Sequence, residues 1–116
     1  MKLNLAVLRV RDLARARVFY EALGLSFVEE RHGSGPIHYS ASFDGCVLEL
    51  YPASPSSPST AGLRFGLAIA DLDRAIERIV AAGGSLVLPL GETPRGRRAV
   101  VADPDGHKIE LTDSAD

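Results

Sequence analysis

Two glutamates recur at equivalent places in this chain and are its strongest candidates for chemistry. Glu49 and Glu110 each follow an Asp-Gly pair and precede a leucine, and the two segments lie 61 residues apart. A carboxylate in such a position could bind a metal ion, act as a general base or contact a ligand directly. It could also be neutralised by a neighbouring cation, so the sequence leaves four roles open for both residues.

The two glutamates belong to a longer internal repeat. Residues 12–50 and 71–111 share the pattern Asp-Leu-x-x-Ala, then a glycine, then Asp-Gly-x-x-x-Glu-Leu, with an offset of 59 to 61 residues. Two similar units that face each other tend to enclose a cavity, so the repeat bears on function. We therefore predict two modules, residues 1–51 and 63–113, joined by a Pro/Ser-rich linker over residues 52–62.

Each module is predicted to fold as β-α-β-β-β. Asp12 and Asp71 are suited to cap the two helices, and Gly24 and Gly83 are suited to end them. Short apolar or alternating segments between turn residues predict the strands. These strands are expected over residues 3–10, 26–30, 37–43 and 46–51 in the first module and 63–70, 86–88, 97–102 and 107–111 in the second.

The alternation of side chains along a strand predicts which residues point away from the helices. On that face we expect charged groups among apolar ones, a composition typical of a ligand site. The candidate ligand-binding residues are Leu5, Val7, Arg9, Val47, Glu49, Tyr51, Arg64, Lys108 and Glu110.

Composition limits the classes of protein and partner. The 116 residues, 46% of them apolar, are enough for one domain with a hydrophobic core. A net charge of −2 gives no electrostatic signature of nucleic-acid binding, and no apolar run is long enough to span a membrane. One cysteine excludes an intrachain disulfide and suits a reducing compartment. We expect a cytoplasmic protein without nucleic-acid or membrane partners.

The motifs together resemble the vicinal oxygen chelate superfamily, which includes glyoxalase I, extradiol dioxygenases and bleomycin-binding resistance proteins. They are the Asp-Leu pair that opens each helix, Phe19-Tyr20, Leu23-Gly24-Leu25, and the segment Asp103-Pro-Asp-Gly-His107-x-x-Glu110-Leu111. The resemblance implies an α+β fold of two tandem βαβββ modules, with curved sheets around a cavity and helices outside. It also implies a homodimer, because similar proteins are usually homodimers whose cavities form between modules.

The resemblance further implies where a metal would sit. In metal-dependent members each module supplies a His or Gln from its first strand and a Glu from its last. The glutamates map onto Glu49 and Glu110, but the first-strand positions hold Leu5 and Arg64. Leucine has no lone pair and arginine stays protonated. No metal cofactor is therefore predicted, with a divalent metal as the alternative if His38 or water replaces the missing imidazoles.

Two functional hypotheses follow. The first is a metal-independent small-molecule-binding protein, similar to the bleomycin-resistance branch, in which Arg64 grips an anionic ligand or pairs with Glu110 and Tyr51 stacks on a planar one. The alternative is a lyase, isomerase or dioxygenase with Glu49 or Glu110 as base. The arginines over residues 95–98 are interpreted as a solvated loop.

Overall fold

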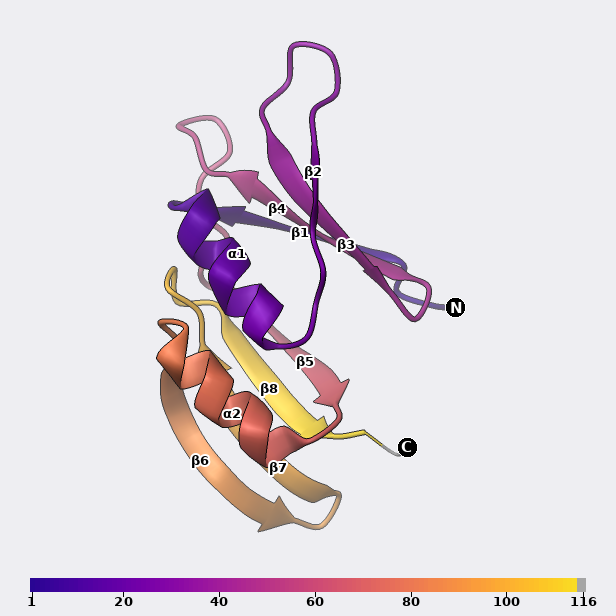
Figure 1. The fold of residues 1–116 in the computed structure, drawn as a ribbon, viewed down its shortest axis with the longest axis vertical. Helices are drawn as coiled ribbons and strands as arrows, with labels where there is room; N and C mark the ends of the chain where they lie inside the picture. The colour runs from indigo at the N-terminus through magenta and orange to yellow at the C-terminus, as the bar shows by residue number, and fades with distance from the viewer. Residues whose placement is uncertain (115–116) are drawn as a thin grey trace.

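The computed structural model describes residues 1–114 and consists of two similar halves, each a four-stranded sheet with one helix on one face (Figure 1). Module 1 contains β1 (Leu5–Val10), α1 (Leu13–Ala22), β2 (Val28–Glu30), β3 (His38–Phe43) and β4 (Cys46–Pro52). Module 2 contains β5 (Arg64–Ile69), α2 (Leu72–Ala81), β6 (Ser85–Thr93), β7 (Gly96–Ala102) and β8 (Lys108–Asp113). Neither of these ten-residue helices is long and apolar enough to cross a membrane.

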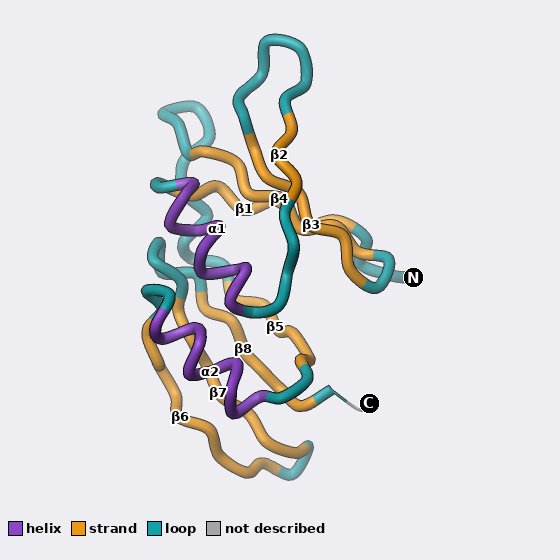
Figure 2. Tube along the Cα trace, in the orientation of Figure 1, coloured by secondary structure: helices purple, strands orange, loops and turns teal. Residues whose placement is uncertain are grey.

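The two sheets have the same topology. Their strand orders are β1-β4-β3-β2 and β5-β8-β7-β6, and the first strand of each module pairs in parallel with the last. The remaining neighbours are antiparallel. Figure 2 shows the helices and strands recurring in the same order in both halves. The predicted fold of two βαβββ modules is confirmed.

Each helix lies on one face of its own sheet, and helices α1 and α2 lie side by side on the same side of the molecule (Figure 1). Phe19 and Tyr20 of α1 and Leu72 and Ile79 of α2 are completely buried there. Gly84, just after α2, lies so close to α1 that an added Cβ would come within 2.6 Å of the Phe19 ring. Only glycine therefore fits at this position between the two helices.

The turns follow the sequence signals with one exception. Asp12 caps α1 as predicted, and its carboxylate accepts a hydrogen bond of 3.0 Å from the Arg15 amide. Asp44-Gly45 has positive φ at both residues, as a tight hairpin turn requires. Asp71 occupies the N-cap position of α2 but has a φ of 53° and makes no capping hydrogen bond through its side chain. The prediction of an Asp71 cap was wrong, because a left-handed backbone turns that side chain away from the helix end.

A chain of buried polar groups fastens residues 52–62 to both modules. The Tyr20 hydroxyl donates to Oδ2 of Asp103 at 2.7 Å, and Nδ1 of His107 lies 2.8 Å from the same oxygen. On the other side of the ring, Nε2 of His107 lies 2.6 Å from Oγ1 of Thr60, which also accepts from the Arg9 amide. This segment therefore holds β1 against the turn that precedes β8.

Burial and hydrogen bonding shift the pKa of Asp103 in opposite directions, whereas burial and a neighbouring charge shift the pKa of Tyr20 in the same direction. Burial alone would raise the pKa of the Asp103 carboxyl, but its contacts with His107 and Tyr20 outweigh burial and lower that pKa below its ordinary value. Burial and the adjacent Asp103 charge both raise the pKa of Tyr20. Asp103 is therefore held ionised and Tyr20 neutral.

Candidate functional site

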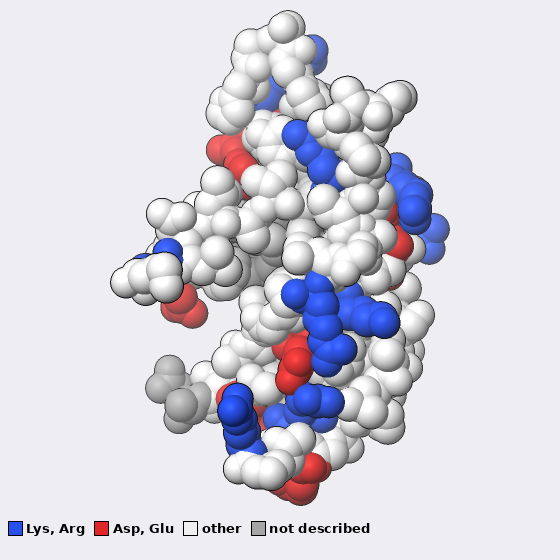
Figure 3. All heavy atoms as spheres, turned by 180° about the vertical axis from the view of Figure 1, so that it is seen from behind, with Lys and Arg blue, Asp and Glu red and all other residues white. Residues whose placement is uncertain are grey.

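The sheet faces that point away from the helices carry the residues that the sequence singled out. The parallel registers set candidate residues beside one another: Leu5 with Val47, Val7 with Glu49, Arg9 with Tyr51, and Arg64 with Lys108. Figure 3 shows this side of the molecule, with basic side chains gathered around acidic ones in the lower half, which module 2 forms. The candidate residues divide into a charged group on module 2 and a more apolar group on module 1.

Glu110 on β8 is held by two arginines. Arg64 on β5 contributes an Nη2 that lies 3.3 Å from Oε2, and Arg98 on β7 contributes an Nη1 that lies 3.3 Å from Oε1. The expected Arg64–Glu110 pair is confirmed, because β5 adjoins β8 as the topology requires. Two guanidinium groups on one carboxylate leave a net positive charge on this face.

A pocket of about 420 Å³ opens beside this group. Its walls are Thr93, Pro94, Arg95, Arg98, Glu110 and Thr112. Within the described part of the chain, Nε of Arg98 is buried and has no hydrogen-bond partner. Because Arg95 and Arg98 line this pocket against the single carboxylate of Glu110, its wall carries excess positive charge, which suits an anionic group.

The arginines over residues 95–98 do not act as one solvated loop, so that interpretation was wrong. Arg97 and Arg98 are part of β7 and point to opposite faces. Arg97 binds Asp113, with N–O distances of 2.8 and 2.9 Å, and Asp73, which ties the strand to α2. Only Arg98 and the neighbouring Arg95 face the pocket.

On module 1, the Tyr51 ring is enclosed by two neighbours. The His38 ring stacks on it with a centroid separation of 4.1 Å and an interplanar angle of 9°. The Arg9 guanidinium lies 4.6 Å from the Tyr51 centroid. Because β4 lies between β1 and β3, the two contacts come from opposite sides. A planar ligand would have to displace one of them to stack on Tyr51.

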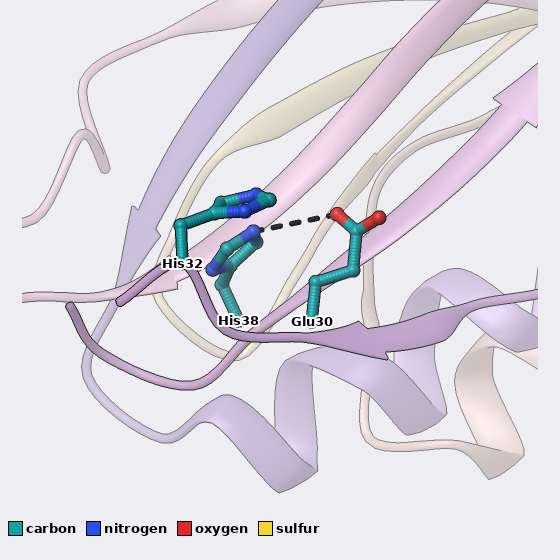
Figure 4. A group of neighbouring side chains, drawn as sticks. All are labelled: Glu30, His32 and His38. Carbon is teal, nitrogen blue, oxygen red and sulfur yellow. Dashed lines mark ion pairs between the residues drawn. The ribbon is translucent and has the colours of Figure 1, made fainter. Parts of the chain in front are cut away.

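Glu49 lies beside the same histidine. Its Oε2 is 4.0 Å from Nε2 of His38, and Oε1 of Glu30 is 3.4 Å from that nitrogen. His38 is 1% exposed and the Glu49 side chain 17%, so both are shielded from water. In Figure 4 the His32 ring lies close to the His38 ring, and Glu30 approaches His38 from the side.

The positions at which the resemblance places a metal do not fit one. Leu5 offers no ligand atom, and it is 49% exposed on its strand. Arg64 is cationic and occupies one oxygen of Glu110. This leaves the two glutamates, without an imidazole at either first-strand position, and two carboxylates alone make a poor transition-metal site.

Sequence reasoning missed two contributors to these faces. The role of Arg98 was missed because the arginines over residues 95–98 were interpreted as solvated. The strand predicted over residues 97–102 already contains Arg98, and one hairpin joins it to the strand of Glu110. His38 was left without a direction, because β3 reads His-Tyr-Ser-Ala-Ser-Phe and has no clear alternation. The pairing of Ser40 with Glu49 fixes its direction, since His38 lies two residues from Ser40 and so shares its face.

Comparison with known proteins agrees with this architecture. The family model described as the Glyoxalase/Bleomycin resistance protein/Dioxygenase superfamily matches residues 2–111. An uncharacterized protein of Mycolicibacterium smegmatis is 33% identical over 93% of this chain and 90% of its own length. The lactoylglutathione lyase of Salmonella typhimurium is 30% identical, covering 100% of this chain and 95% of the lyase.

Solved structures give the same result. TnmS3, an antibiotic binding protein from Streptomyces sp. CB03234, superposes with a TM-score of 0.77 and 27% identity over 99% of this chain and 97% of TnmS3. The two modules, their order and their sheet topology are thus those of a known fold.

Proposed function

Because this chain belongs to the Glyoxalase/Bleomycin resistance protein/Dioxygenase superfamily, we propose that it binds a small anionic or aromatic molecule without the metal chelate that the resemblance implies. The superfamily that the motifs predicted is confirmed by the family match over residues 2–111. One scaffold of this kind supports several activities, so the proposal depends on the site.

The observation that carries the proposal is the pair of arginines on Glu110. Arg64 and Arg98 together supply two positive charges against one carboxylate, which leaves one positive charge in excess. A carboxylate, sulfonate or phosphate group in this pocket would balance that charge.

The apolar part of the ligand would lie on module 1. Leu5 and Val7 are 49% and 38% exposed, and Val47 lies beside Leu5. We propose that a second copy of the chain covers this face, giving a homodimer with two equivalent cavities. The similarity to TnmS3, an antibiotic binding protein, supports a binding role.

The test uses 8-anilinonaphthalene-1-sulfonate, an aromatic sulfonate whose fluorescence reports binding, with protein kept in EDTA. We expect saturable binding that Arg98→Gln weakens about 10-fold or more, because a charge-assisted hydrogen bond is lost. Arg74→Gln is the matched control, since Arg74 is largely exposed on α2 and faces Asp71.

Three results would contradict the proposal. They are binding that appears only after metal is added, an absence of saturable binding, and equal effects of the two arginine variants. Equal effects would show that the probe responds to overall charge instead of to the pocket at Glu110.

A second candidate function is a lyase or isomerase reaction with Glu49 as general base. The specific support is the shielded position of Glu49 next to His38, and the similarity to lactoylglutathione lyases. Under this alternative, lactoylglutathione lyase activity would be measurable and Glu49→Gln would lower kcat about 100-fold or more. Glu29→Gln, on the other face of β2, would leave kcat unchanged.

A further inference from the structure

Glu30, His32 and His38 form a compact group, here called the hairpin cluster, where β2 turns into β3 (Figure 4). One potential ligand atom from each residue lies within 4.8 Å of the other two. The cluster is separate from the Leu5 and Arg64 positions that the superfamily resemblance singles out. None of its three residues is used by the pocket at Glu110.

The hairpin itself brings the three side chains together. Glu30 pairs with His38 across the two strands, so their side chains share one face. The Gly35 amide donates to the His32 carbonyl at 2.9 Å, and Gly33 adopts a φ of 58°. This tight turn folds His32 back over β3, and the centroids of the two imidazole rings lie 5.1 Å apart.

His38 has the orientation expected of a metal ligand. Its Nδ1 lies 3.2 Å from the Pro36 carbonyl oxygen, which can only accept, so Nδ1 carries the proton in the neutral ring. The lone pair of Nε2 then points towards Glu30 and Glu49. Metal-binding histidines typically donate their second ring N–H to a carbonyl or carboxylate in this way.

The separation of the Glu30 and His38 ligand atoms matches that of two ligands on one zinc ion. Two ligands about 2.1 Å from a tetrahedral zinc ion lie about 3.4 Å apart. Nε2 of His38 and Oε1 of Glu30 are separated by 3.4 Å. The Tyr51 hydroxyl is also 3.3 Å from Nε2, a long O–H···N contact that an ion would displace.

The charge balance also favours a cation. Nε2 of His38 faces two carboxylates, since Oε1 of Glu30 lies 3.4 Å from it and Glu49 adds a second negative charge at 4.0 Å. Glu30 and His32 are partly or fully exposed, so their side chains can close on an ion that enters from solvent. Two imidazoles and one carboxylate form a donor set for zinc, cobalt or nickel, and a poor one for magnesium or calcium.

From these observations we propose that the hairpin cluster binds one divalent transition-metal ion through Glu30, His32 and His38, with Glu49 beside it. This site goes beyond the proposed ligand-binding function. Its three ligands also differ from the first-strand positions, Leu5 and Arg64, at which the resemblance places metal ligands. Water would complete the coordination sphere, because three protein ligands leave at least one position open.

The test is a calorimetric titration of tag-free, EDTA-treated protein with Zn²⁺, and a parallel titration with Co²⁺ followed by its visible absorption. We expect one ion per chain, and no comparable binding of Mg²⁺. His32→Gln and Glu30→Gln should each weaken Zn²⁺ binding at least about 10-fold. Loss of a residue that only hydrogen-bonds a metal ligand already costs about 10-fold or more in affinity, and loss of the ligand itself should cost at least as much.

Glu29→Gln is the matched control, because it removes the same charge from the opposite face of β2. His32 is exposed, so its variant keeps the test informative even if substitution of the buried His38 prevents folding. Absence of stoichiometric Zn²⁺ binding, or equal binding by wild type, His32→Gln and Glu30→Gln, would overturn the proposal. Neither result would alter binding of the aromatic sulfonate in EDTA, so the two proposals fail independently.

Discussion

At the scale of single residues, the groups that contact a buried histidine distinguish a structural role from a ligand-binding role better than its burial does. His107 and His38 are both buried. Nε2 of His107 lies 2.6 Å from Oγ1 of Thr60, and its Nδ1 is in ion-pair contact with Asp103 at 2.8 Å. Nδ1 of His38 lies 3.2 Å from the Pro36 carbonyl, and its Nε2 lies 3.3 Å from the Tyr51 hydroxyl and 3.4 Å from Oε1 of Glu30. The partners of His107 fasten a buried turn, whereas those of His38 include a partly exposed carboxylate that an ion from solvent can reach.

The Asp103 chain gives a prediction of pH-dependent stability. Its folded pKa lies below the unfolded value, so the stability from the ionised carboxylate is present above about pH 4 and is lost as pH falls below it. Tyr20→Phe removes a hydrogen bond to this carboxylate and should lower the free energy of unfolding by about 1.5–3 kcal/mol at pH 7. Urea denaturation at pH 7 and pH 3 should show a smaller difference from wild type at pH 3.

Tyr39→Phe provides the control for this prediction. It removes a tyrosine hydroxyl that lies next to Arg17 instead of Asp103. Its effect on the free energy of unfolding should be similar at the two pH values. A Tyr20→Phe difference that is unchanged at pH 3 would show that Asp103 does not carry the linkage.

At the scale of elements, the internal repeat predicted the order of helices and strands, and the alternation of side chains predicted the two faces of each regular strand. The order of helices and strands followed from two copies of one pattern, and the faces of β1, β4, β5 and β8 followed from strict alternation of side chains. The Arg64–Glu110 pair could be predicted because it needs only the strand order and that alternation.

Elements without a clear period were predicted less well. Strand β6 was expected over residues 86–88 but extends from Ser85 to Thr93. Pro89 and Gly91 interrupt its pattern, and its pairing with β7 shifts register between Leu86 and Gly91. The strand conformation of such an irregular edge strand depends on its pairing with the neighbouring strand, here β7, more than on the strand propensity of its own residues. The hairpin cluster was missed for the same reason, since only the pairing of β3 shows where His38 points.

The two helix starts give a prediction about capping. Asp12 accepts a hydrogen bond from the Arg15 amide, so Asp12→Ala should lower the free energy of unfolding by about 1 kcal/mol. Asp71 makes no capping bond and has a φ of 53°, a conformation that glycine adopts without strain. Asp71→Gly should therefore leave stability unchanged or raise it by up to about 1 kcal/mol.

Thermal unfolding of the two variants beside wild type checks this contrast. Because both substitutions remove one aspartate from the start of a helix, the change in net charge is the same in each. Equal losses of stability would mean that the two carboxylates act through the helix dipole and not through local geometry.

At the scale of the whole molecule, each sheet carries a helix on one face, and residues 1–114 place no second layer over the other face. On that other face Leu5 and Val7 remain 49% and 38% exposed. Exposed apolar groups that lie together on one sheet face mark a surface used for binding. A second copy that covers this face would complete the cavity that the proposed function needs.

Association of two copies can be tested separately from ligand binding. Leu5→Lys places a charge on the face that a second copy would cover, and burying an unpaired charge is costly. Sedimentation velocity should show a dimer for wild type and a dissociation constant about 10-fold or more higher for Leu5→Lys. Val18→Lys adds the same charge at an exposed position of α1 and should leave the dimer intact. A wild-type protein that is monomeric throughout the concentration range would mean that each chain binds its ligand on an open face.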